Sequence, residues 1–148
     1  MAKWRGGDKW QAKIDRVVAS LKDAAAVDVG FLPGATYPNG TPVALVAAVQ
    51  NFGAPSRHIP PRPFFSEMIL ENKGHWPRDV VASLKRHDFE AKHALEDMGM
   101  LIKGELQQKI NTFSGVPLKP ETVRRKGHDK QLIETAHMVN SVDYQVVK

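Results

Sequence analysis

The sequence contains no cysteine, and none of its 148 residues lies in a long apolar run. The lack of cysteine excludes disulfide bonds, thiolate metal sites and cysteine nucleophiles. A membrane-spanning helix needs about 20 apolar residues, and no stretch approaches that length. The first residues, MAKWRGGDKWQAK, lack the apolar region of a secretory signal. These absences are typical of a cytoplasmic product, with no membrane partner.

Recognisable catalytic and cofactor motifs are also missing. The sequence has no P-loop, no GxGxxG and no GxSxG, and its six histidines form no HxxxH or HExxH pair. His87 and His93 are six residues apart, which on one helix places them on different faces. We therefore predict no catalytic, cofactor-binding or metal-binding residues, and we expect that the protein is not an enzyme.

The excess of positive charge is mild. The chain has 21 basic and 16 acidic residues, a net charge of +5. The basic residues are dispersed except for one cluster, which is either an ordinary solvated loop or a patch that binds a partner. The cluster consists of Lys119, Arg124, Arg125, Lys126 and Lys130. No aromatic residues interleave with it, so a small basic nucleic-acid-binding domain is the alternative function and not the main one.

Hydrophobic periodicity predicts an α+β fold in a single domain, residues 1–148. Alternation with a period of two predicts strands near 27–32 and 142–147. Helical periodicity begins with an amphipathic helix from Trp10 to Leu21, for which Asp8 is the expected N-cap. We expect a small antiparallel or mixed sheet packed by several helices, because neither strand is long enough to stand alone.

The longest predicted helix covers residues 89–113. Its apolar side is expected to comprise Ala91, Leu95, Met98, Leu101, Ile102, Leu106 and Ile110. Gly99 and Gly104 weaken this helix and therefore suggest close packing. Residues 64–87 are helical but broken around 72–77, and a further short helix is expected at 132–142. The turn-rich stretches 33–41 and 114–131 are predicted to be long, mobile loops.

Residues 42–52 are predicted to form a short, largely buried helix. Thr41 is the expected N-cap, Pro42 suits the first helical position, and Gly53 suits a left-handed residue after the last turn. Its apolar stripe is expected at Leu45, Val46, Val49 and Phe52. A buried strand is the competing interpretation, because VALVAAV is rich in valine.

The stretch HIPPRPFF, residues 58–65 and named here the proline segment, predicts a stiff extended conformation. Three prolines remove backbone donors and push the preceding residues toward extended geometry. Phe64 and Phe65 can anchor the segment in an apolar pocket, and the planar guanidinium of Arg62 can bind a carboxylate or backbone carbonyls. The segment then serves either as a crossover within one domain or as a contact between subunits.

Two segments in order resemble the neck and tail-completion proteins of tailed bacteriophages, a family of small tail-component or virion-morphogenesis proteins. They are VALVAAVQNFGAPSRHIPPRPFFSEMI at 43–69 and PLKPETVRRKGHDKQLIETAHMVNSVDYQVV at 117–147. The chain departs from the family pattern at Asn51, where relatives carry Glu, and at Ala136, where they carry Gly. Because Ala disfavours positive φ, a continuous helix is the alternative to a turn at Ala136. The motif residues assigned to assembly or structure are Asn51, Phe52, Gly53, Ile59, Pro60, Pro61, Arg62, Pro63 and Phe64, then Pro120, Thr122, Lys126, Leu132, Ile133 and Thr135.

The resemblance implies a structural virion protein and not a catalyst. Such subunits act at the head–tail junction or the tail end, often as six copies in a ring around a channel for DNA. The implied partners are connector or stopper, tail-terminator and tail-tube proteins, together with further copies of the chain. The resemblance implies no cofactor and no specific DNA binding. It implies a location in the virion after assembly in the host bacterial cytoplasm, from a subunit that can be monomeric when free.

Overall fold

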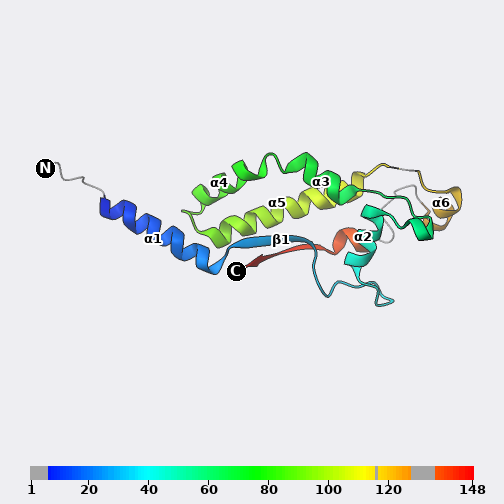
Figure 1. Cartoon of the computed structure of the whole chain (residues 1–148), viewed down its shortest axis with the longest axis horizontal. Coiled ribbons are helices and arrows are strands. Elements are labelled where there is room, and N and C mark those ends of the chain that lie inside the picture. The colour runs from blue at the N-terminus through cyan, green and yellow to red at the C-terminus, as the bar shows by residue number, and fades with distance from the viewer. Residues whose placement is uncertain (1–6, 116, 128–135) are drawn as a thin grey trace.

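The computed structural model describes residues 7–115, 117–127 and 136–148. The fold is α+β, as predicted, with a long central helix packed on a two-stranded sheet (Figure 1). The elements are α1 (Gly7–Asp23), β1 (Ala26–Phe31), α2 (Val43–Phe52), the 3-10 turn η1 (Pro55–Arg57), α3 (Phe64–Asn72), α4 (Trp76–Arg86), α5 (Ala91–Thr112), α6 (Pro120–Lys126), α7 (His137–Asn140) and β2 (Val142–Val147).

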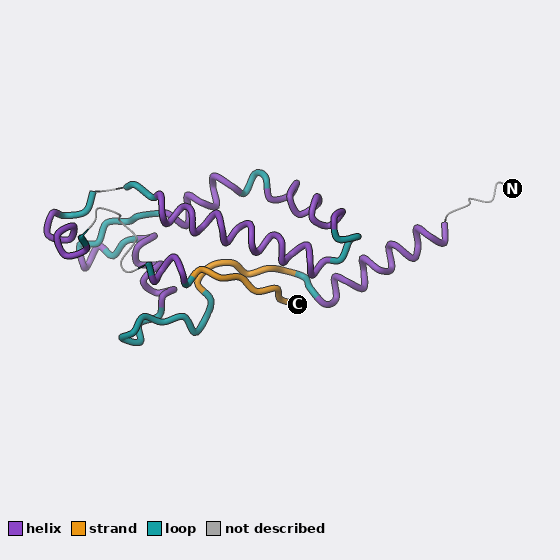
Figure 2. The backbone as a smooth tube through the Cα atoms, turned by 180° about the vertical axis from the view of Figure 1, so that it is seen from behind, coloured by secondary structure: helices purple, strands orange, loops and turns teal. Residues whose placement is uncertain are grey.

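The sheet joins two strands that lie far apart in the sequence. β1 and β2 run antiparallel in a register that extends from Ala26 opposite Val147 to Phe31 opposite Val142. Both strands lie within one residue of their predicted positions. They run side by side along α5 (Figure 2), which contacts each of them. The alternation that identified the strands therefore reflects one face toward α5 and one face toward solvent.

The core lies where α5 meets the sheet, α2, α3 and α7. Its largest fully buried side chains include Phe64, Met68, Leu106 and Ile110. α3 and α4 lie along α5 (Figures 1 and 2). They are separate helices, as the predicted break indicates, because α3 ends at Asn72 and α4 begins at Trp76. Among the described residues, the buried cluster comprises Val43, Ala47, Phe64, Met68, Leu106, Ile110, Phe113, Met138, Val139 and Val142.

Residues 42–52 form a helix and not a strand, but the helix is only partly buried and the predicted stripe is wrong at Leu45 and Phe52. α2 buries Val43, Ala47 and Asn51, whereas Leu45 and Phe52 are exposed. Apolar side chains surround almost the whole of this helix, so periodicity alone does not identify its inner face. The predicted caps are also wrong: Pro42 occupies the N-cap position of α2, and Asp8 lies inside the first turn of α1.

α5 is shorter than predicted at its start because Asp88 and Phe89 have positive φ angles of 51° and 65°. These two residues make the turn between α4 and α5. Leu101, which was expected on the apolar side of α5, is 38% exposed. The prediction of close packing is right for Gly99, where an added Cβ would lie 2.3 Å from the Tyr144 ring. It is wrong for Gly104, which has open space where a Cβ would be.

The two predicted loops contain regular structure. Thr36 and Pro42 form an isolated bridge, and the Tyr37 amide donates to the Thr41 carbonyl at 2.8 Å. Residues 114–131, predicted as a loop, include the helix α6. The mobility of residues 33–41 stays a prediction, and residues 116 and 128–131 of the second loop lie outside the described residues.

The contrast between the two glycines of α5 gives a direct stability test. Gly99→Ala should lower the free energy of unfolding by about 1–3 kcal/mol, because the new methyl group must displace the Tyr144 ring. The matched control Gly104→Ala should raise it by up to about 1 kcal/mol, because alanine is the better helix former in open space. Urea unfolding at low protein concentration measures both. Equal effects of the two substitutions would contradict the close packing of Tyr144 on Gly99.

Candidate assembly site

The proline segment is anchored at its start by a short turn after α2. The Ala54 amide donates to the Ile59 carbonyl at 2.9 Å, and the Ile59 amide donates back to the Ala54 carbonyl at 3.1 Å. η1 lies between Ala54 and Ile59 in the sequence, and His58 closes the turn in a left-handed conformation with φ 54°. The chain thereby reverses direction after α2 and brings the prolines back onto that helix.

Gly53 permits this close return. Its φ is 76°, as expected for a residue after the last turn of a helix, although its ψ of 175° places it outside the left-handed helical region. A Cβ at this position would lie 2.8 Å from both the Ile59 carbonyl oxygen and the Pro61 nitrogen. Both neighbours are backbone atoms and cannot rotate away. Glycine is therefore required here for space as well as for φ.

Asn51 joins α2 to the start of α3. Its Oδ1 accepts hydrogen bonds from the backbone amides of Phe65 (3.1 Å) and Ser66 (3.2 Å), and its Nδ2 donates to Ser66 Oγ at 2.9 Å. The first amides of a helix have no partner within the helix, so Asn51 acts as an N-cap supplied from another helix. Sequence reasoning missed this role. The available signal was a polar Gln50–Asn51 pair in an otherwise apolar helix.

Arg62 is buried, with 9% of its surface exposed. Its backbone amide donates to the Gln50 carbonyl at 2.7 Å, and its Nη1 donates to Gln50 Oε1 at 2.8 Å. Burial lowers the pKa of the Arg62 guanidinium from its usual range. Its Nε is buried and has no hydrogen-bond partner among the described residues. The Arg62 side chain is therefore held by the side-chain amide of Gln50. It is not held by a carboxylate, which was one of the partners that the sequence allowed.

The two phenylalanines follow directly. Phe64 is fully buried, and Phe65 meets it edge to face with ring centroids 6.4 Å apart. Phe65 also lies against β1, because a Cβ on Gly30 would be 3.4 Å from its ring. Together with Gln50, Asn51 and Arg62, these contacts attach the proline segment to its own chain. The sequence allowed two roles for the proline segment, a crossover within one domain or a contact between subunits. The contacts described above are those of a crossover within one domain.

An apolar groove of about 430 Å³ lies beside this unit and is named the α2 groove. Phe52, at its margin, is 74% exposed, and Leu45 of α2 and Leu70 of α3 are also exposed large apolar side chains. Monomeric proteins keep exposed apolar surface small, so an open apolar groove with an exposed phenylalanine at its margin is a candidate contact with another molecule. The lining residues are Val29, Gly30, Phe31, Ala44, Ala47, Ala48, Asn51, Phe52, Phe64, Phe65, Ser66 and Ile69.

The second motif is only partly described. Pro120 and Thr122 lie in the first turn of α6, and Lys126 is its last residue. Leu132, Ile133 and Thr135 lie outside the described residues. Ala136 has φ 57° and ψ 6°, so the left-handed turn is kept although Ala replaces the Gly of the family pattern. The continuous helix considered for this position is therefore wrong, and α7 begins only at His137.

A cluster of titratable side chains fastens α4 to α5. Asp97 Oδ2 accepts a hydrogen bond from the buried Ser83 Oγ at 2.5 Å and lies 2.9 Å from both Arg86 Nη1 and His87 Nε2. The hydrogen bonds from Ser83 and then His87 hold the pKa of Asp97 below its ordinary value. These bonds run between two helices of one chain, so we interpret the cluster as structural.

His87 and His93 are closer than the sequence suggested. α4 ends at Arg86 and α5 begins at Ala91, so the two histidines do not share a helix, and their ring centroids lie 5.6 Å apart. Within the described ranges, His, Cys, Asp and Glu side chains form no group of three or more that could hold a metal ion. Among the helices that the structure describes, none has both the length and the apolar character needed to cross a membrane.

Comparison with protein-family models, curated proteins and solved structures finds no match for this chain.

Replacing Asn51 tests the link between α2 and α3. Asn51→Ala removes the acceptor for two α3 amides and should lower the free energy of unfolding by about 1–2 kcal/mol. Asn51→Asp is the matched control, because its carboxylate can still accept from both amides and from the Ser66 hydroxyl. Urea denaturation at pH 7 measures the difference. An Asn51→Ala protein as stable as the parent would show that the cap contributes nothing.

Asp97 should contribute stability that depends on pH. Its pKa is lowered in the folded state, so the contribution is present above the unfolded value of about 3.9 and disappears as pH falls through the folded pKa. Asp97→Asn should therefore be about 1 kcal/mol less stable at pH 7, and the difference should shrink on acidification below about pH 4. Thermal unfolding at several pH values measures this. Asp28→Asn, exposed on the sheet, is the control and should show no comparable effect.

Proposed function

We propose that this protein is a structural virion protein of a tailed bacteriophage or prophage. It acts at the head–tail junction or the tail end by protein–protein assembly, as a subunit of a ring. The two sequence motifs that resemble neck and tail-completion proteins support this proposal. The observation that carries it is a pair of exposed apolar surfaces, one at each end of the molecule.

The first surface is the apolar stripe of α1. Trp10, Ile14, Val18 and Leu21 are each more than half exposed, and α1 buries none of its residues. Figure 1 shows α1 projecting from the body beyond the ends of α4 and α5. A helix with a separate apolar stripe gains stability by packing it against another surface. Within the described chain this stripe stays open, which favours a contact with another subunit.

The base of α1 is fixed, so its direction is set by the fold. Ser20 Oγ accepts from the Ala91 amide at 3.3 Å and donates to the Phe89 carbonyl at 3.2 Å. Arg16 Nη1 lies 2.6 Å from Asp88 Oδ2, and Lys13 Nζ lies over the Phe89 ring. These contacts attach α1 to the turn between α4 and α5. A projecting helix held in this way needs little further ordering when it docks, which lowers the entropic cost of assembly.

The second surface is the α2 groove, which the exposed Phe52 helps to line. It lies around α2 and α3, toward the end of the molecule opposite α1 (Figure 1). Two different surfaces at opposite ends favour a head-to-tail contact between copies. Such a contact produces a closed ring when the rotation between copies closes, and a filament when it does not. Assembly into the virion then takes place in the host cytoplasm, and DNA passes through the channel without a specific binding site.

The stripe on α1 gives the sharpest test. Ile14→Glu places a charge in the stripe at an exposed position, whereas the control Ala12→Glu places the same charge on the opposite face of α1. We expect both proteins to fold, as circular dichroism would show. We expect Ile14→Glu to abolish addition of the protein to purified phage tails in negative-stain images, and Ala12→Glu to preserve it.

Two results would overturn the proposal. One is a parent protein that adds no density to tails or heads of the phage that carries its gene. The other is salt-sensitive DNA binding by the free protein that Ile14→Glu leaves unchanged, because this would favour the nucleic-acid-binding alternative.

A further inference from the structure

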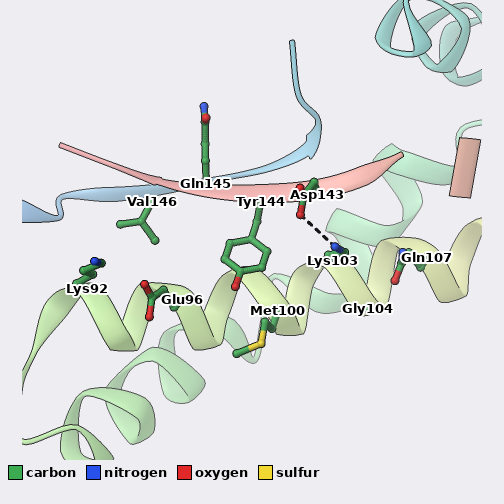
Figure 3. A pocket seen from close by; sticks show the side chains of 10 residues that line it. All are labelled: Lys92, Glu96, Met100, Lys103, Gly104, Gln107, Asp143, Tyr144, Gln145 and Val146. Atoms are coloured by element: carbon green, nitrogen blue, oxygen red, sulfur yellow. Dashed lines mark hydrogen bonds and ion pairs between the residues drawn. The ribbon is translucent and has the colours of Figure 1, made fainter. Parts of the chain in front are cut away.

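The outer edge of β2 is open. β1 pairs with one edge of β2, and no other strand joins this sheet in the described ranges. Beside β2 lies an open groove of about 800 Å³, bounded by β2 and α5 (Figure 3) and named the β2 groove. We propose that a second copy of this chain occupies the β2 groove, with the two β2 strands paired antiparallel about a twofold axis.

The β2 groove suits an added strand in length and chemistry. Its floor on α5 runs from Lys92 to Gln107, about 22 Å at 1.5 Å per helical residue. The six residues of β2 extend about 20 Å. Tyr144 and Val146 point from the strand toward α5, while Gln145 points away (Figure 3). Natural edge strands are often protected by an inward-pointing charge, and β2 has none on the face toward α5.

The one acidic residue of β2 does not block the edge. Asp143 Oδ1 lies 3.0 Å from Lys103 Nζ of α5, so its charge is already paired within the chain (Figure 3). That ion pair and the hydrogen bond that the Tyr144 backbone contributes lower the pKa of Asp143, with the Lys103 bond as the larger cause. The charge of Asp143 is therefore balanced by Lys103 within the same chain.

The spacing of the layers agrees with a twofold contact. α5 contacts both β1 and β2, so it lies beneath the ladder between them. Pairing two β2 edges would separate each α5 from its copy by two strand spacings, about 9–10 Å. Packed helices lie about 8–10 Å apart. One contact between two copies can therefore pair their β2 strands and pack their α5 helices at the same time. Gly104 has open space where a Cβ would be, which leaves room for the second helix.

The residues of α5 that line the β2 groove are named the α5 stripe. Their charges match those of the same stripe in a second copy that runs antiparallel. The stripe reads Lys92, Glu96, Met100, Lys103, Gly104 and Gln107. With the axis between Gly99 and Met100, Glu96 of one copy lies opposite Lys103 of the other, and Lys92 lies opposite Gln107. Tyr144 packs on Gly99 next to Met100, so the same axis passes the middle of β2. Glu96 thus meets Lys103 of the other copy, which Asp143 contacts within its own chain, and the apolar Met100 side chains lie next to the axis.

This self-complementarity favours a second copy over a strand from a different protein. A foreign strand would satisfy the backbone groups of β2 but would bring no matching helix to α5. The contact is isologous and closes at two copies. It uses neither α1 nor the α2 groove, so the inference does not rest on the proposed function and is tested without any tail component.

The first experiment measures the mass of the full-length protein by sedimentation equilibrium. We expect a species of twice the 16.4 kDa chain mass. Met100→Glu places two like charges beside the axis, at a position 55% exposed in one copy, and should weaken dimerisation at least tenfold while leaving the fold intact. The control Leu70→Glu, at a 66% exposed position of α3, should remain a dimer. A parent protein that stays monomeric at about 100 µM, or a dimer that Met100→Glu leaves unchanged, would overturn the proposal.

The second experiment locates the axis. Because the chain has no cysteine, Met100→Cys introduces its sole thiol. Oxidation should produce a covalent dimer, since residues at a close helix crossing can meet the Cα separation of about 4.4–6.8 Å that a disulfide requires. Leu70→Cys should remain uncoupled under the same conditions. A dimer in which Met100→Cys fails to cross-link, or in which both variants cross-link equally, would contradict an axis beside Met100.

Discussion

The packing of α5 against the sheet is the constraint on which the rest of the structure depends. β1 and β2 have six residues each and lie far apart in the sequence, and a two-stranded sheet of that size is marginal in water by itself. α5 contacts both strands, and its Gly99 admits the Tyr144 ring that brings helix and strand into direct contact. The helix therefore compensates the entropic cost of closing the segment of residues 32–141 between the two strands.

The proline segment extends this framework to α2 and α3. Its rigidity comes from prolines, but its position comes from the two polar residues of α2. Gln50 holds Arg62 through both backbone and side chain, and Asn51 caps the first amides of α3. The segment thus orients α3 toward α5 and sets the α2 groove between α2, α3 and β1. A rigid crossover keeps the shape of the α2 groove the same for each partner that contacts it.

The distribution of exposed apolar and unpaired groups separates three surfaces. The α1 stripe and the α2 groove lie toward opposite ends and differ from one another, which suits head-to-tail assembly. The β2 groove lies along the middle of the molecule and is complementary to a copy of itself. The three surfaces use different physics: burial of an exposed helix face, filling of an apolar groove, and hydrogen bonding of a strand edge joined with helix packing.

The sequence by itself determined the elements of the fold and the stiffness of the proline segment. Alternation located both strands to within one residue of their observed positions. Helical periodicity, prolines and glycines located α2, α5 and the break before α4. These signals are local, since they depend on the period of the backbone and on the φ angles that Pro and Gly allow. Local signals did not find the inner face of α2, which is apolar nearly all round, nor the conformation of Ala136, which turns left-handed despite its Cβ.

Only the tertiary structure decided which side chains meet. Asn51 became a cap because α3 begins beside it, Arg62 was paired with Gln50 and not with a carboxylate, and His87 met His93 because a turn separates their helices. It also decided which apolar faces stay open. The sequence of α1 is that of an ordinary amphipathic helix, and only its surroundings show that its apolar stripe is uncovered. Contacts between residues distant in sequence depend on the path of the whole chain, and no local pattern encodes that path.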